Sequence, residues 1–354
     1  MSEHQQASEP LLEVRNISKH FAGKAGGFLG RKGAPIKAVD GVSFTVAERE
    51  TLGLVGESGC GKSTTGRVIA KLIDPTEGSI RFDGDEIADL SPRAMRAHRS
   101  KVQMVFQDPY SSLNPRHTIG TIVGAPFRIQ GVRPEKGIKA EVQAMLERVG
   151  LNPEHYNRYP HEFSGGQRQR IGIARALALR PKLIICDEPV SALDVSVQAQ
   201  VINLLEDLQN DFGLAYVFIA HDLSVVRHIS DRVAVMYLGK IMEIADRDDL
   251  YADPMHPYTR SLMSAVPVPD PRLERRRERI LLQGDLPSPS NPPTGCVFHT
   301  RCPVHREMLD DTQREKCRTQ APVLEDKAPG HQVYCHFSGP GSIASNLGTA
   351  VSAV

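Results

Sequence analysis

Residues 56–64, with the sequence GESGCGKST, match the P-loop pattern G-x-x-x-x-G-K-S/T. Glycines in such a loop let backbone N–H groups turn inward around phosphate oxygens, and the start of the following helix adds partial positive charge. Lys62 would reach the β- and γ-phosphates, and Ser63 would ligate magnesium. The strand-like run TLGLV precedes the loop and a helical run follows it. The sequence therefore predicts a nucleoside triphosphate site formed by Gly56, Glu57, Ser58, Gly59, Cys60, Gly61, Lys62, Ser63 and Thr64.

Two carboxylates, Asp187 and Glu188, follow the apolar run LIIC. A carboxylate at the end of such a strand is placed to hold magnesium through water, which predicts that role for Asp187. Glu188 beside it is placed to polarise the attacking water as a general base. The alternative is an acidic pair that only caps the strand.

The stretch FSGGQRQR, residues 163–170, has the features of a second phosphate-binding helix start. Ser164 can cap the helix that follows, and Gly165 and Gly166 permit close approach of an anion. The P-loop already surrounds its own nucleotide, so this second helix start has no evident ligand within the same chain. The alternative is a flexible turn before a helix.

Together these motifs resemble the ATPase subunits of ABC transporters. The family's signature motif matches Ser164, Gly165, Gly166 and Gln167. In that family two nucleotide-binding domains meet head to tail. The resemblance therefore implies that this helix start caps the γ-phosphate held by the partner's P-loop.

The resemblance extends to other positions. It implies that Phe21 stacks on adenine, although a core position is the alternative, and that His221 contacts the γ-phosphate. Gln107 matches the glutamine that contacts magnesium and the attacking water. Phe163 stands where leucine is commoner, which we expect to be tolerated. The loop that crosses the dimer interface matches Ser191, Ala192, Leu193 and Asp194.

Longer stretches are similar to the dipeptide/oligopeptide importer ATPases, especially the F-type subunit. They include FQDPYSSLNPR, DEPVSALDVSVQAQ, MYLGKIMEI and HPYTRSLMSAVP. This resemblance implies an ATP-hydrolysing subunit that powers peptide uptake. Its expected partners are a paralogous ATPase subunit in a heterodimer, two membrane permeases and a substrate-binding protein. Three alternatives stay open: a relative that imports nickel or glutathione, a soluble ABC ATPase that acts on DNA or the ribosome, and a regulatory subunit whose cysteine-containing tail senses redox state.

Composition argues against nucleic-acid-binding, secreted and membrane-spanning proteins. The chain has 354 residues and a net charge of +1, so no basic field points to nucleic acid. Its polar start, MSEHQQASEP, lacks the features of a signal peptide, and no apolar run reaches membrane-spanning length. We expect a soluble protein, peripheral on the cytoplasmic face of the cell membrane.

The pattern of elements predicts an α/β core. The runs LIICDE and LAYVFIAH read as strands buried in a largely parallel sheet, with a helix between them. LLEVRNISKHF alternates like an edge strand, AGKAGGFLGRKGAPIK reads as a loop, and RVAVMYLGKIMEIA reads as two strands joined at Leu238 and Gly239. The resemblance makes this a P-loop NTPase of the ABC type, with a RecA-like core, an antiparallel β subdomain and a helical subdomain. We predict a nucleotide-binding domain over 1–254 with its helical part at about 108–180, a C-terminal extension over 255–340 and a disordered tail over 341–354.

Four cysteines lie close together near the C-terminus, with the spacing C-x5-C-x14-C-x17-C. Disulfides are rare in a reducing cytosol, so this group suggests a metal or iron–sulfur site. The Cys302-Pro303 pair is similar to ferredoxin-type ligation. Related importer ATPases imply a [4Fe-4S] cluster here; zinc, helped by His299 or His305, and unliganded thiols are the alternatives. The predicted ligands are Cys296, Cys302, Cys317 and Cys335.

Two further features have simpler interpretations. Cys60 and Cys186 are predicted to be small packing residues. The arginine-rich run RLERRRERI, residues 272–280, is predicted to be a solvated helix face, with contact to anionic lipid as the alternative.

Overall fold

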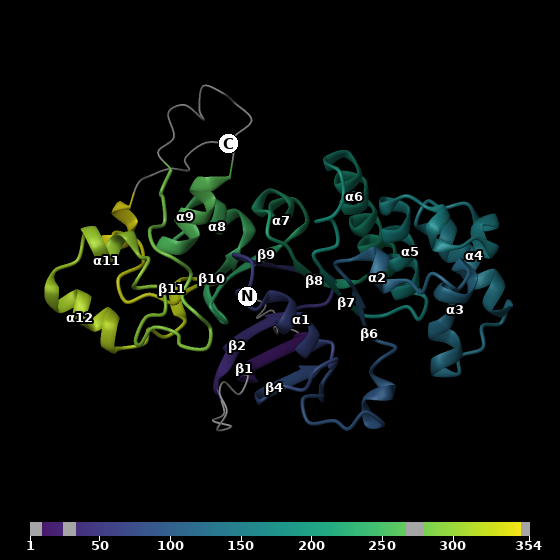
Figure 1. The fold of residues 1–354 in the computed structure, drawn as a ribbon, viewed down its shortest axis with the longest axis horizontal. Helices are drawn as coiled ribbons and strands as arrows, with labels where there is room; N and C mark the ends of the chain where they lie inside the picture. The colour runs from purple at the N-terminus through teal and green to yellow at the C-terminus, as the bar shows by residue number, and fades with distance from the viewer. Residues whose placement is uncertain (1–8, 24–32, 267–278, 348–354) are drawn as a thin grey trace, which may run out of the picture.

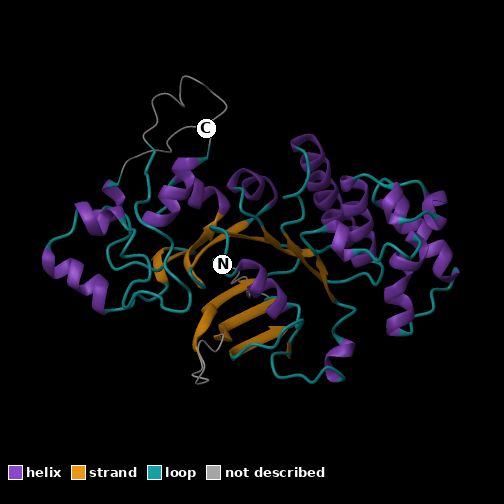
Figure 2. Cartoon of the chain, in the orientation of Figure 1, coloured by secondary structure: helices purple, strands orange, loops and turns teal. Residues whose placement is uncertain are grey.

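The computed structural model describes residues 9–23, 33–266 and 279–347. Two β-sheets lie one below the other, with helix α1 between them and further helices above the larger sheet (Figures 1 and 2). Most of the predicted loop 22–37 and most of the arginine-rich run 272–280 lie outside the described residues.

The larger sheet has eight strands in the described part of the chain and is mixed rather than purely parallel. Its central strands pair in parallel, and their residues are buried as expected for a sheet covered on both faces. Leu238 and Gly239 form the turn between β9 and β10, as predicted, and both have positive φ. In spatial order the strands are β11 (Glu325–Ala328), β12 (His331–Val333), β10 (Lys240–Asp246), β9 (Arg232–Tyr237), β3 (Thr51–Val55), β8 (Ala215–Ile219), β7 (Leu183–Asp187) and β6 (Val102–Val105).

The smaller sheet is antiparallel, in the order β2-β1-β4-β5. The prediction of an edge strand at 11–21 is wrong, because β1 pairs with β2 on one side and with β4 on the other. The alternation of apolar and polar residues in β1 indicates that one face of the strand is buried and the other solvated. Central antiparallel strands show this pattern as well as edge strands. The strands are β1 (Leu12–Gly23), β2 (Gly33–Val46), β4 (Glu77–Phe82) and β5 (Asp85–Glu86).

The block at 108–180 is helical, as predicted. Val142, Met145, Leu146 and Val149 are buried and Ile138 is partly buried, which confirms the predicted apolar face. This block forms the end of the molecule farthest from the C-terminal extension (Figure 1). Its helices are α2 (Pro109–Ser112), α3 (Ile119–Gln130), α4 (Gly137–Arg148), η2 (Pro153–Asn157), η3 (Pro160–Glu162) and α5 (Gly165–Leu177).

The remaining helices divide between the two faces of the large sheet. Helix α1 contacts strands of both sheets, and α6, α7, α8 and α9 lie on the opposite face of the large sheet (Figure 2). Helix α6 ends at Gly213, which has a φ of 65° and matches the predicted stop. The bounds are α1 (Lys62–Ile69), η1 (Ala94–Ala97), α6 (Val195–Phe212), α7 (Leu223–Ile229), α8 (Arg247–Ala252) and α9 (Pro257–Ala265). In the described residues no helix combines the length and apolar character needed to span a bilayer.

The C-terminal extension is part of the large sheet, because β12 pairs with β10 and carries β11 at the edge. It also contains α11 (Pro303–Glu307), α12 (Asp311–Thr319) and η4 (Ile343–Asn346). The last of these falls within the segment expected to be disordered, 341–354, of which residues 348–354 lie outside the description.

A buried carboxylate joins the extension to the sheet. Glu243 is fully buried on β10, and its Oε1 lies 2.6 Å from Nε2 of His331 on β12. The same carboxylate accepts hydrogen bonds from the backbone N–H groups of Met255 and His256. A charge taken out of water in this way is stabilised only by its partners.

Glu243→Ala should therefore reduce the free energy of unfolding by about 3–5 kcal/mol, because three buried donors lose their acceptor. Urea denaturation measures this. The matched control is Glu325→Ala on β11, an exposed carboxylate paired with Lys327, which should change stability by no more than about 0.5 kcal/mol. Equal effects of the two substitutions would contradict the role of Glu243.

Candidate functional site

The predicted P-loop connects β3 to α1, and two glycines fix its path. Gly56 has a φ of 151°, and a Cβ there would lie 2.1 Å from the Met236 carbonyl oxygen. Gly61, with a φ of 107°, would place a Cβ 2.1 Å from the Ala38 carbonyl oxygen. No other residue could occupy these positions without moving backbone. The loop is therefore packed tightly against β9 and β2.

Lys62 and Ser63 begin α1 and lie where the phosphates and magnesium are expected. The ammonium group of Lys62 donates to the carbonyl oxygens of Gly56 and Glu57, at 2.7 and 3.1 Å. The Ser63 hydroxyl donates to Asp187 Oδ1 at 2.6 Å. Parallel pairing of β3, β8 and β7 brings the ends of these strands to one edge, which places Asp187 beside the P-loop.

Asp187 has the surroundings expected of a magnesium ligand. Its carboxyl group is buried, and this burial raises its pKa. Oδ2 has no hydrogen-bond partner among the described residues, and the nearest cation, Arg67 Nη2, is 3.9 Å away. A hydroxyl and a carboxylate with a free oxygen are the donors that Mg²⁺ prefers. Ser63 and Asp187 therefore fit the ion.

Glu188, Gln107 and His221 come together next to this pair. Gln107 Nε2 donates to Glu188 Oε2 at 2.9 Å, and His221 Nδ1 lies 3.4 Å from the same oxygen. Glu188 has a φ of 46°, a left-handed conformation that costs free energy in a residue with a side chain. The strained turn directs the carboxylate out of the strand and toward the two other groups. Such a carboxylate can orient and deprotonate a water molecule.

The signature segment forms a helix N-terminus. Ser164 is the N-cap of α5: its Oγ accepts from the Gln167 N–H, and Gln167 Oε1 accepts from the Ser164 N–H. Ser164 is exposed, whereas Gly166 is buried and a Cβ there would lie 2.4 Å from Val197. The helix start is thus preformed, and its cap faces solvent.

The remaining predicted positions are also partly open. Phe21 is 39% exposed, so it is not a core residue, and Lys19 Nζ lies 5.3 Å from its ring centroid. Ala192 and Asp194 of the predicted interface loop are exposed, and Ser191 donates to the Glu188 carbonyl oxygen. The loop is therefore attached to the same turn that carries Glu188.

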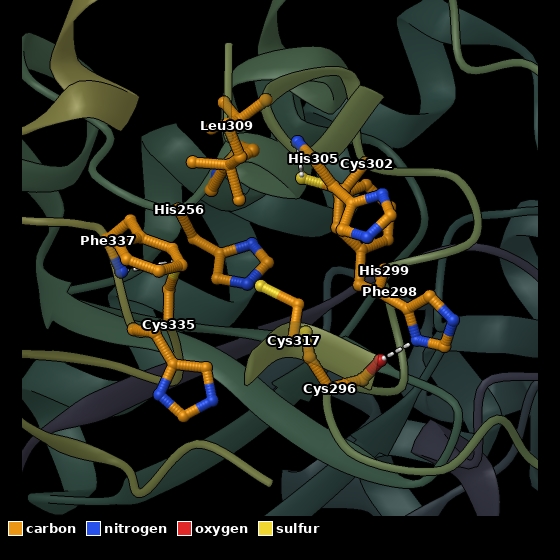
Figure 3. A pocket seen from close by; sticks show the side chains of 13 residues that line it. His256, Cys296, Phe298, His299, Cys302, His305, Leu309, Cys317, Cys335 and Phe337 are labelled. Atoms are coloured by element: carbon orange, nitrogen blue, oxygen red, sulfur yellow. Dashed lines mark hydrogen bonds between the residues drawn. The ribbon is translucent and has the colours of Figure 1, made fainter. Parts of the chain in front are cut away.

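The four C-terminal cysteines line one cavity (Figure 3). His256, Phe298, His299 and His305 also line it. Among the described residues no three His, Cys, Asp or Glu side chains are grouped closely enough to hold a metal ion, so the geometry supports neither the predicted iron–sulfur cluster nor the zinc alternative. Burial raises the pKa values of the four thiols, to about 12 for Cys302 and about 11 for Cys317. Cys60 and Cys186 are buried in the cores, as predicted.

Two residues that sequence reasoning missed bind the P-loop from the C-terminal extension. Tyr258 on α9 accepts a hydrogen bond from the Glu57 N–H at 3.0 Å, and Arg301 forms a bidentate ion pair with the Glu57 carboxylate. Neither has a local sequence signal, because Tyr258 and Arg301 contact a residue that lies 201 and 244 positions earlier in the chain.

Comparison with known families gives two matches. The ABC transporter family matches residues 39–191, and the C-terminal region of the oligopeptide/dipeptide transporter family matches residues 242–308. The oligopeptide transport ATP-binding protein AppF of Bacillus subtilis is 56% identical over 330 residues, which cover 93% of this chain and 98% of that protein. OppF of Escherichia coli, with the same description, is 54% identical over 327 residues, covering 92% and 95%.

The chain belongs to the ATP-binding subunits of the oligopeptide/dipeptide ABC transporters. It is an ABC-type ATPase of a peptide transporter, which overturns the alternative of a soluble ABC ATPase acting on DNA or the ribosome. The matched C-terminal region includes Tyr258 and Arg301.

Solved structures show the same nucleotide-binding fold. The dimeric, post-hydrolysis ATP-binding cassette MJ0796, bound to ADP and phosphate, is 29% identical with a TM-score of 0.59, covering 67% of this chain and 98% of that one. CbiO1 of Clostridium perfringens, part of the ABC transporter complex cbiONQ, is 26% identical with the same TM-score, covering 69% and 91%.

Glu188→Gln should lower the rate of ATP hydrolysis by about 10²–10⁴-fold, because the amide cannot accept a proton from water. ATP affinity, measured with a fluorescent ATP analogue, should stay close to that of the unsubstituted protein. The control is Glu206→Gln on α6, which removes a carboxylate that pairs with the exposed His228. If Glu188→Gln hydrolysed ATP as fast as the control, the proposed role of Glu188 as general base would be contradicted.

Proposed function

We propose that this subunit hydrolyses ATP to drive uptake of oligopeptides or dipeptides through separate membrane permeases. The observation that carries the proposal is the convergence of Ser63 with Asp187, and of Glu188 with Gln107 and His221, at one edge of the sheet. A chain with these contacts can hold a nucleotide, its magnesium and an attacking water. The peptide substrate is supported by the names of the relatives AppF and OppF.

We assign the remaining site residues as follows. Phe21 stacks on adenine, the P-loop residues 56–64 bind the phosphates, and Gln107 joins Ser63 and Asp187 at magnesium. Magnesium, when bound, neutralises charge on the β- and γ-phosphates. His221 contacts the γ-phosphate.

The proposed assembly contains a paralogous ATPase subunit, two permeases and a substrate-binding protein, and it places this chain on the cytoplasmic face of the membrane. Within the chain we assign residues 1–254 to the nucleotide-binding domain, its helical part at about 108–180 to permease contact, and 255–340 to the C-terminal extension. The helical part and the extension lie at opposite ends of the molecule (Figure 1), so permease contact leaves the cysteine cavity uncovered.

The peptide assignment is tested with the complex reconstituted in vesicles. Binding protein loaded with an oligopeptide or dipeptide should stimulate ATP turnover, and labelled peptide should enter the vesicles. Stimulation by nickel-loaded or glutathione-loaded binding protein instead would overturn the substrate class while leaving the ATPase assignment in place. A chain that hydrolyses ATP equally fast with and without permeases would contradict coupling.

Residues Ser164, Gly165, Gly166 and Gln167 are proposed to bind the ATP held by the partner subunit, with Ser191, Ala192, Leu193 and Asp194 at the interface. Support comes from the exposed, preformed cap of α5 and from the charge at helix N-termini, which favours anions.

Ser164→Arg should therefore reduce ATP turnover of the assembled complex by at least about tenfold, because a bulky side chain enters the interface where the γ-phosphate is received. Binding of ATP to the chain's own P-loop should be retained. Thr312→Arg is the control, on the exposed first turn of α12 at the opposite end of the molecule (Figure 1). Unchanged turnover with Ser164→Arg would disprove the trans arrangement.

For the cysteine cavity we propose a [4Fe-4S] cluster held by Cys296, Cys302, Cys317 and Cys335. Support comes from the four thiols lining one cavity and from thiolates being the usual ligands of such clusters. Ligation would require loss of four protons from thiols whose pKa values burial raises, so binding should release protons. The cluster would supply one-electron chemistry or a rigid structural link.

Protein purified without oxygen should contain about four iron and four sulfide per chain, measured chemically and by visible absorbance. Cys302→Ser should lose most of the iron, whereas Cys186→Ala, a cysteine buried elsewhere, should retain it. Zinc without sulfide, or neither metal, would contradict the cluster.

A further inference from the structure

The P-loop is held from outside by an ion pair that the sequence motif does not include. Arg301 Nη1 donates to Glu57 Oε2 at 2.8 Å, and Nη2 donates to Oε1 at 3.2 Å. The Arg301 side chain is 10% exposed and that of Glu57 is 26% exposed. A two-point contact between guanidinium and carboxylate fixes orientation as well as distance, particularly away from water.

Glu57 connects this ion pair to the phosphate-binding groups. Its N–H donates to Tyr258, and its carbonyl oxygen accepts from Lys62 Nζ. The extension therefore holds Glu57 at both its amide and its carboxylate, and Glu57 in turn holds the lysine that binds phosphate. A shift of this residue would move the backbone that must meet the phosphate oxygens.

The groups that hold Glu57 are themselves fixed by aromatic packing. The ring centroids of Tyr237, Tyr258 and Phe298 are 4.8–5.4 Å apart, and all three side chains are fully buried. The Arg301 guanidinium carbon lies 5.8 Å from the Tyr237 ring centroid, and the Arg301 N–H donates to the Phe298 carbonyl oxygen. Arg301 is thus anchored by both its side chain and its backbone.

The same segment forms one wall of the cysteine cavity. Phe298 and Cys302 line that cavity, and Arg301 lies between them in the chain (Figure 3). A change in the cavity that moves this turn would also move the guanidinium on Glu57.

The positive charge of Arg301 also has an electrostatic effect on the P-loop. Glu57 carries a negative charge in the loop that receives a polyphosphate, and two like charges at close range repel. Arg301 neutralises that charge where screening by water is weak. We propose that Arg301 is a positioning residue for the ATP site, through which the cysteine-lined C-terminal segment fixes the P-loop and cancels the charge of Glu57.

The proposal rests on ATP binding by this chain. The experiment distinguishes a failure of the role proposed for Arg301 from a failure of ATP binding itself. Five full-length proteins are compared: the unsubstituted chain, Arg301→Gln, Glu57→Gln, the double variant and a control, Arg260→Gln. Dissociation constants are measured on each protein with a fluorescent ATP analogue. The kcat and KM for ATP are measured in the assembled complex. Arg301→Gln should weaken nucleotide binding about tenfold, the size expected for losing a charged hydrogen-bond pair. KM should rise more than kcat falls.

The double variant provides the decisive comparison, because it removes the unpaired carboxylate that Arg301→Gln creates. It should bind nucleotide more tightly than Arg301→Gln alone, and the defect of Arg301→Gln should shrink at high salt. Arg260→Gln is the matched control: Arg260 is buried in the same extension and pairs with Asp253 rather than with a P-loop residue. It should lower the thermal midpoint without changing nucleotide affinity.

Three results would overturn the proposal: unchanged affinity in Arg301→Gln, additive losses in the double variant, or an equal loss of affinity in Arg260→Gln. Absence of nucleotide binding in the unsubstituted chain would instead refute ATP binding itself.

Discussion

The site depends on one steric constraint: the backbone of the P-loop must turn through positions that only glycine can occupy. At Gly56 and Gly61 any side chain would collide with carbonyl oxygens of β9 and β2. The loop therefore owes its shape to both sheets and to the extension that holds Glu57. Phosphate oxygens are bound mainly by backbone N–H groups, so a loop fixed in advance loses little entropy when the nucleotide arrives.

The order of the large sheet places the proposed catalytic groups beside that loop. Because β3, β8 and β7 are adjacent and parallel, their carboxyl ends lie at one edge, and residues far apart in sequence meet there. The Ser63–Asp187 contact is one product of this order. The turn at Glu188 is another, since its left-handed backbone redirects the next carboxylate toward Gln107 and His221. The sheet thus sets the position of Asp187 and Glu188, and the strained turn sets the direction of the Glu188 side chain.

The sequence predicted the parts of this site that are local in the chain. The P-loop, the strand ending at Asp187, the cap at Ser164 and the turn at Leu238 each depend on neighbouring residues, and each forms in the structure. Contacts between residues far apart in the chain were harder to predict from the sequence. The alternation in β1 could not show that the strand has partners on both sides, and spacing among the late cysteines could not show that Arg301 reaches Glu57. Such contacts are decided by which surfaces meet in three dimensions.

In the proposed dimer, the N-terminus of the signature helix α5 is a preformed surface for the partner subunit. The capping box occupies the N–H groups of Ser164 and Gln167, while the first turn of any α-helix leaves further N–H groups without an intrahelical acceptor. Those groups, with the partial positive charge of the helix end, remain available for an anion. Because α5 is already packed against α3 and α6, this surface needs no further folding when a partner approaches. In the proposed dimer, the γ-phosphate held by the partner would supply the missing acceptor.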